Sequence, residues 1–161
     1  MFRQNRSSSV SAKRLVSTVV IVSALPLTCA CSPKLGPDET PTALAVLESK
    51  TDQASPRDRC FLYAELVSEM TEVARKQLSS GDSGRALDSL RLVRRYADKT
   101  LQDVADDSRK LKGAELLMRH TSFRLEDMLH QASYNDRHDV EETLKELHTV
   151  QTQLIMQVFK K

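Results

Sequence analysis

The sequence has little aromatic side-chain surface: none of its 161 residues is tryptophan, and phenylalanine and tyrosine together make up 4%. Small-molecule pockets draw heavily on aromatic and apolar side chains, so the chain has little material for lining one. The sequence also contains no nucleophile elbow, phosphate-binding glycine loop or zinc-ligand signature. We therefore predict that the chain is not an enzyme and needs no cofactor.

Proline is absent after Pro56, and Gly81, Gly84 and Gly113 are the only glycines in that stretch. The same hundred residues are rich in leucine, alanine, glutamate, lysine and arginine, which favour helix. These features predict an all-α domain over residues 56–161.

The N-terminal segment combines basic residues with a short apolar run. Arg3, Arg6, Lys13 and Arg14 precede a 13-residue stretch, Leu15 to Leu27, that has no charge. Such a stretch is too short to span a bilayer, which takes about 20 apolar residues. A basic start, an apolar run and a small-residue exit are typical of a secretory signal peptide. We predict a signal peptide over residues 1–30 and hence export.

The signal ends in Leu27-Thr28-Cys29-Ala30-Cys31-Ser32, which resembles the lipobox of bacterial lipoproteins. Ala30 and Cys31 occupy the positions before and after the cut, whereas Thr28 stands where the family usually has leucine. The resemblance implies lipidation at Cys31 and anchoring on the periplasmic side of the inner membrane or at the outer membrane. The alternatives are cleavage to a soluble periplasmic or secreted protein, and an uncleaved anchor.

Removal of the signal changes the charge of the chain. Residues 31–161 keep 20 of the 24 cationic side chains and all 22 acidic ones, for a net charge of −2. The basic character of the whole chain belongs largely to the signal, so we predict no nucleic-acid partner. The one cysteine of the helical region, Cys60, is interpreted as a small buried residue, with a Cys31–Cys60 disulfide as the alternative.

The mature chain divides into a linker and the helical domain. Residues 31–55 contain most of the prolines, which predicts a flexible linker of about 30 Å, with a short helix over 41–49. Ser55, Pro56 and Asp58 form an N-terminal capping pattern for a helix over about 56–79. Gly81 and Asp82 suit the turn that follows. A last helix is predicted over about 137–159.

Between these helices, apolar residues recur at alternating steps of four and three. Eleven of the fourteen positions from Ala86 to Ala132 are apolar, and only Asp107 is charged. A repeat of 3.5 residues predicts one long helix over 83–132 with a coiled-coil-like seam. The predicted fold is therefore all-α, with elongated antiparallel helical hairpins around one long central helix. The alternative is a break near Asp106-Asp107-Ser108, which gives a compact four-helix bundle.

Two weaker resemblances concern the helical region. The stretch Gly81-Asp82-x-x-x-Ala86-Leu87-x-x-Leu90 resembles the turn between the helices of a tetratricopeptide repeat, without recurring at the period of 34 residues. The overall plan of signal, linker and helical domain is similar to many exported bacterial proteins. Both resemblances imply packing of helices and carry no mechanism.

Histidines and basic residues are the remaining candidates for a site. His120, His130, His138 and His148 could bind a metal, but a carboxylate-bridged dimetal bundle needs more inward ligands than Asp127-x-x-His130 supplies. We therefore assign no metal ligands. Basic residues on the central segment alternate with acids, which indicates a solvated face with ion pairs: Arg91, Arg94, Arg95, Lys99, Arg109, Lys110 and Lys112.

The predicted function is that of an exported, lipid-anchored, non-enzymatic interaction or structural module of the cell envelope. Thr100, Asp107 and Thr121 interrupt the seam, which suggests that a protein partner or a second copy covers it. The alternative function is a periplasmic metal-binding or small-ligand-binding helical bundle.

Overall fold

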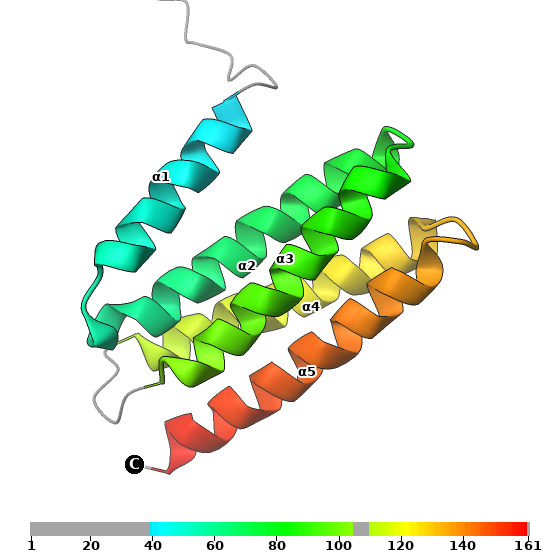
Figure 1. Ribbon diagram of the computed structural model, residues 1–161. Coiled ribbons are helices and arrows are strands. Elements are labelled where there is room, and N and C mark those ends of the chain that lie inside the picture. Colours follow the sequence, from blue (N-terminus) through cyan, green and yellow to red (C-terminus); the bar gives the residue numbers. More distant parts are fainter. Residues whose placement is uncertain (1–38, 105–109, 161) are drawn as a thin grey trace, which may run out of the picture. The chain divides into compact units, whose positions relative to one another are not determined.

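The computed structural model describes residues 39–104 and 110–160, and these residues are helical and contain no strand (Figure 1). The chain forms five helices in this part: α1 (Glu39–Gln53), α2 (Pro56–Ser79), α3 (Ser83–Gln102), α4 (Leu111–Gln131) and α5 (Arg137–Phe159). The all-α prediction is therefore confirmed. α2 and α5 have the bounds that the sequence predicts.

The predicted long helix over 83–132 is wrong, because α3 ends at Gln102 and α4 begins at Leu111. The predicted site of a break, Asp106-Asp107-Ser108, lies outside the described residues. Asp103 is the C-cap of α3, and carboxylates near a helix C-terminus oppose the helix dipole. Two separate helices can also bury both halves of the seam against the same neighbours, which one rod of about 75 Å could not do.

Four helices form a bundle in which each helix has two neighbours. α2 packs against α3 and α4, and α5 packs against the same two helices. Sequential helices are antiparallel, as their short turns predict. The turn between α2 and α3 and the turn between α4 and α5 lie at the same end of the bundle (Figure 1). α3 and α4 lie diagonally opposite each other. The hairpin of α2 and α3 therefore packs beside the hairpin of α4 and α5, and the two have the same orientation. The arrangement is thus closer to the predicted alternative, the compact four-helix bundle.

One hydrogen bond, from Ser83 to Asp136, joins the turn between α2 and α3 to the turn between α4 and α5. Asp136, before α5, accepts from the Ser83 hydroxyl at 3.0 Å and from the Ser133 hydroxyl at 2.7 Å. In the other turn, Gly81 has a φ of 81°, a left-handed conformation that glycine adopts without strain. Asp82 accepts a hydrogen bond from the Arg85 amide, as the capping pattern predicts.

The seam lies in the core of this bundle. Its leucines and methionines are buried, as are Ala86, Ala97 and Ala114, whereas Ala132 is partly buried. Thr100 and Thr121 are buried too, and their hydroxyls donate to the carbonyls of Tyr96 and Leu117. The two threonines therefore do not mark an open surface, and the expectation that a partner covers the seam loses its basis. Asp107 lies outside the described residues.

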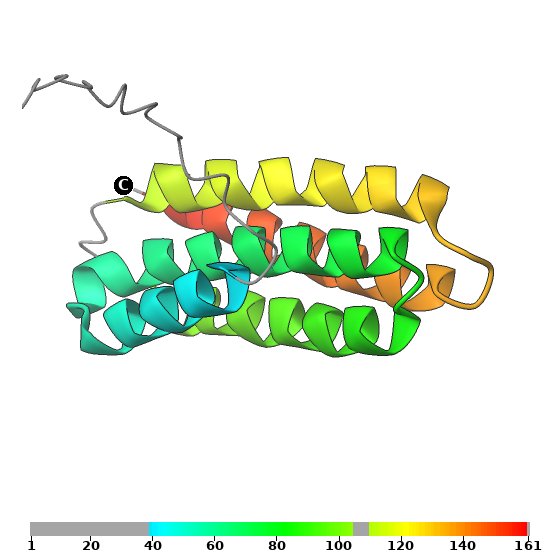
Figure 2. The same ribbon diagram turned by 90° about the horizontal axis from the view of Figure 1, so that it is seen from above.

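α1 extends the helix predicted over 41–49 at both ends, so residues 39–53 are helical rather than part of a flexible linker. Among the described helices, α1 has backbone contacts with α2 alone and lies outside the four-helix bundle (Figure 2). Leu44 and Leu47 pack against the core from this helix, and Thr51 is fully buried. The helical unit therefore begins at α1 and not at Pro56.

Candidate functional site

The one predicted modification site, Cys31, lies outside the described residues, as does the whole predicted signal over 1–30. Cys60 is a free thiol that is 1% exposed, which agrees with its interpretation as a buried core residue. Burial, with a smaller contribution from Asp103, raises the pKa of this thiol to about 12. Because the thiolate is the reactive form, this raised pKa and the burial make the Cys60 thiol a poor nucleophile near neutral pH.

The histidines do not come together. All four are exposed, His120 and His130 on α4, His138 and His148 on α5. Within the described part of the chain, only His148 has a carboxylate close by, with its Nε2 atom 3.7 Å from Glu126 Oε1. No group of three or more histidine, cysteine, aspartate or glutamate side chains that could hold a metal occurs in residues 39–104 and 110–160.

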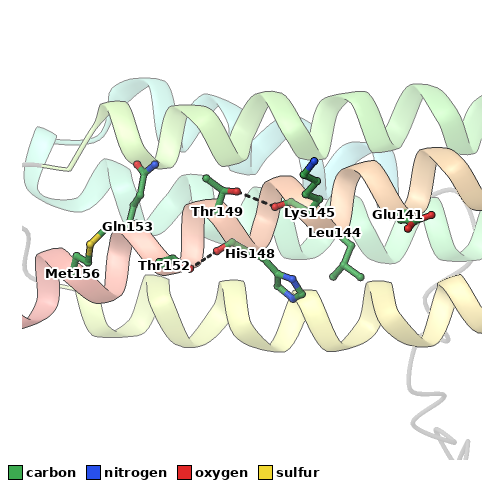
Figure 3. Close-up of a pocket in the computed structure, with 8 residues that line it drawn as sticks. All are labelled: Glu141, Leu144, Lys145, His148, Thr149, Thr152, Gln153 and Met156. Carbon is green, nitrogen blue, oxygen red and sulfur yellow. Dashed lines mark hydrogen bonds between the residues drawn. The ribbon is translucent and has the colours of Figure 1, made fainter.

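A shallow surface depression of about 640 Å³ runs along α5 (Figure 3). Its lining comes from this helix alone and includes Leu144, His148, Thr152 and Met156. His148 is directed toward the neighbouring helix, whereas the side chains of Lys145 and Gln153 leave α5 on the other side (Figure 3). A substrate pocket requires polar groups that converge on one point, and the polar groups of this surface do not.

A second groove, of about 500 Å³, lies where α1, α2 and α4 meet. Ala43, Leu44 and Leu47 of α1 form one wall, and Leu117 of α4 belongs to the opposite one. Glu65, Ser68 and Glu69 of α2 lie between them. The groove shows that the first turns of α1 lie close to α4, although the two helices make no direct backbone contact.

The basic residues of α3 behave as predicted. Arg91 pairs with Asp88 at 3.0 Å, and Arg94 pairs with Glu142 of α5. Arg95 and Lys99 lie over the rings of Tyr96 and Tyr63, at 5.9 and 5.2 Å from the ring centroids. This face therefore satisfies its own charges and leaves no concentrated positive patch.

The exposed surface of α4 is different, and sequence analysis did not single it out. Leu116 is 42% exposed and Phe123 is 56% exposed, seven residues apart and so on one face of the helix. We name the exposed residues of this helix surface the α4 outer face: Lys112, Leu116, Arg119, His120, Phe123, Arg124, Asp127 and His130. It carries three permanent cations, one acid and two large apolar side chains. One pattern in the sequence could have indicated this face: Leu116 and Phe123 are apolar, lie out of phase with the seam and have basic residues nearby.

None of the described helices is both long enough and apolar enough to cross a bilayer. Neither a protein-family model, nor a curated protein, nor a solved structure matches this chain.

Proposed function

We propose that the chain is exported, is anchored by a lipid on Cys31, and acts as a non-enzymatic interaction or structural module of the cell envelope. The observation that carries the proposal is the order of the N-terminal residues: four cations, a 13-residue uncharged run, and then Ala30-Cys31. Membrane association would come from the lipid.

The described residues support a non-enzymatic role. The only thiol among them is buried with a pKa near 12, and each histidine lies on the surface of the bundle. The grooves are wide and are lined by one to three helices without a buried, convergent set of polar groups. Such a bundle is suited to presenting helix surfaces to a large partner.

The decisive experiment is mass spectrometry of the full chain, expressed in a Gram-negative bacterium and purified from its membranes. We expect the signal to be absent and Cys31 to be the acylated N-terminal residue. Cys31→Ser should abolish acylation and release the protein from membranes, whereas the matched variant Cys29→Ser should leave both unchanged. An unmodified Cys31 in membrane-associated protein, or a retained signal, contradicts the proposal.

The alternative of a periplasmic metal or small-ligand binder is tested separately by calorimetric titration of the purified protein with zinc, copper and iron. Its basis is the four histidines and the acids around them, of which His148 and Glu126 form the closest pair. Binding heat from a cation that disappears in His148→Ala would favour this alternative, and the absence of heat for all three metals would exclude it for them.

A further inference from the structure

A short stretch of chain would connect the lipid anchor of the proposed function, on which this inference rests, to the first described helix. Because α1 begins at Glu39, only eight Cα steps separate Cys31 from the packed helical unit. An extended chain covers 3.3–3.6 Å per residue, so this connection spans at most about 29 Å. The bundle would therefore be held at the membrane surface.

The groove between α1, α2 and α4 shows which part of α4 lies near the start of α1. Ala43 and Leu44, in the second turn of α1, share a groove with Leu117 of α4. On α4 itself, the residue before Leu117 is the exposed Leu116, and Arg124 reaches across to donate to the Ser68 hydroxyl of α2 at 3.1 Å. Because Ser68 also lines that groove, the edge of the α4 outer face at Arg124 borders the groove beside α1.

The chemistry of the α4 outer face fits a negatively charged bilayer surface. Helices that lie in the interface present leucine or phenylalanine between lysine and arginine side chains, which approach the phosphate groups. Leu116 and Phe123 supply the apolar contacts, and Lys112, Arg119 and Arg124 supply the charge. Arg119 also lies 3.8 Å from the carboxylate of Glu115 on the same helix. Asp127 is the only acid on this face, and Glu69 is an exposed acid on the neighbouring α2.

The corresponding face of α3 lacks these properties and is a natural control. Its exposed residues include Arg85, Asp88, Arg91, Arg95 and Asp98, with no large apolar side chain. Asp82 and Asp88 pair with two of these arginines. This surface mixes arginines with acids and has no exposed large apolar side chain to offer a membrane.

We propose that the α4 outer face rests on anionic phospholipid headgroups, with Leu116 and Phe123 entering the headgroup layer. The lipid on Cys31 keeps the protein at the membrane, and the α4 outer face sets its orientation. The surface of α3 diagonally opposite then points away from the bilayer and is available to other proteins.

The test uses the acylated full-length protein in vesicles of phosphatidylethanolamine and phosphatidylglycerol. Because the acylated Cys31 has no free thiol and Cys60 is buried with a raised pKa, an introduced cysteine can be labelled selectively with a fluorophore. His120→Cys places the label on the α4 outer face, and Asp88→Cys places it on the exposed side of α3. Quenching by nitroxide-bearing lipids reports which label is close to the bilayer.

We expect several-fold stronger quenching at position 120 than at position 88, and a smaller difference in vesicles of phosphatidylcholine alone. Adding Arg119→Glu should lower the preference for this orientation at least about fivefold, since each cation near an anionic surface contributes about 1 kcal/mol. Circular dichroism checks that each variant remains helical.

Equal quenching of the two labels on vesicle-bound protein would overturn this inference, and would favour a protein as the occupant of the α4 outer face. Failure of the proposed function has a different signature, because a protein without the lipid would not float with the vesicles at all. Flotation and quenching are measured on the same samples, so the two failures are distinguished.

Discussion

The hydrogen bond between Tyr96 and Glu48 connects α1 to α3, a helix with which α1 has no direct backbone contact. The Tyr96 ring is 6% exposed, and its hydroxyl donates to the half-buried carboxylate of Glu48. A hydrogen bond to a charged group contributes about 1.5–3 kcal/mol to stability when it is shielded from water. Because Glu48 remains partly solvated, we expect a coupling free energy of about 1–2 kcal/mol between the two side chains.

A double-mutant cycle measures this coupling. Tyr96→Phe, Glu48→Gln and the double variant are unfolded in urea at pH 7, and hydrogen exchange is followed in the amides of α1. Each single variant should lower the free energy of unfolding, the double variant should cost less than the sum, and α1 amides should exchange faster. Tyr134→Phe removes a hydroxyl from a side chain that is 93% exposed and should change nothing. Additive effects of the two substitutions on the free energy of unfolding would show that Tyr96 and Glu48 are not coupled.

The same side chain predicts sensitivity to alkaline pH. Burial, followed by the hydrogen bond to Glu48, raises the pKa of Tyr96 from 10.0 to about 12. Above pH 10 the unfolded chain releases this proton while the folded chain still holds it, so stability falls as the pH rises from 10 to 12. The loss from this group should approach about 2 kcal/mol at pH 12. Urea unfolding of the wild-type protein should show this loss of stability between pH 10 and pH 12. Tyr96→Phe, which lacks the titrating hydroxyl, should lose less stability over the same pH range, by the amount that Tyr96 contributes.

Three further predictions follow from the described residues. In a variant with Cys29→Ser and Cys31→Ser, the Cys60 thiol, with its pKa near 12, should react with Ellman's reagent only as the protein unfolds, and rapid reaction of this native variant would contradict the burial of Cys60. Gly81→Ala should lower stability by about 1 kcal/mol or more in thermal unfolding because φ is positive there, whereas Gly84→Ala, in open space, should be neutral or stabilising. Leu125→Ala should cost about 2–5 kcal/mol in urea unfolding because the side chain is fully buried, and Leu116→Ala, at 42% exposure, should cost less than about 1 kcal/mol.

The helices could be predicted largely because their termini carry local signals. Pro56 at the start of α2 and Gly81 in the turn after it act within a few residues, and the structure has both where the pattern predicts them. Ser55 is the N-cap residue of α2, but its hydroxyl donates to the Asp58 carboxylate at 3.0 Å instead of capping a backbone amide. Local patterns therefore predicted the positions of the turns better than the individual hydrogen bonds.

The central break and the position of α1 depend on contacts between distant residues. Val104 and Leu111 are seven residues apart, so the apolar pattern continues in phase although the helix does not. Two helices that face one core repeat the same periodicity as one long helix, and periodicity alone cannot separate the two cases. The docking of α1 depends on Leu44, Leu47 and Tyr96, of which Tyr96 lies about fifty residues away along the chain.

The α4 outer face could not be predicted because it is defined by what the fold leaves uncovered. Phe123 is an apolar residue in an amphipathic segment, and its exposure follows only from the packing of α4 against α2 and α5. Isolated apolar residues on a surface are common, so no pattern in the chain groups Phe123 with Leu116 and Lys112. The lipidation of Cys31, the export of the chain and its partners stay predictions.

The diagonal placement of α3 and α4 has a consequence for how the bundle can be taken apart. Each hairpin is a continuous piece of sequence, with α2 and α3 in residues 56–102 and α4 and α5 in residues 111–159. Neither hairpin can bury its inner surface without the other, because α2 packs against α4 and α3 packs against α5. Two polypeptides divided between Gln102 and Leu111 should therefore reassemble when mixed, which makes the bundle suited to fragment complementation.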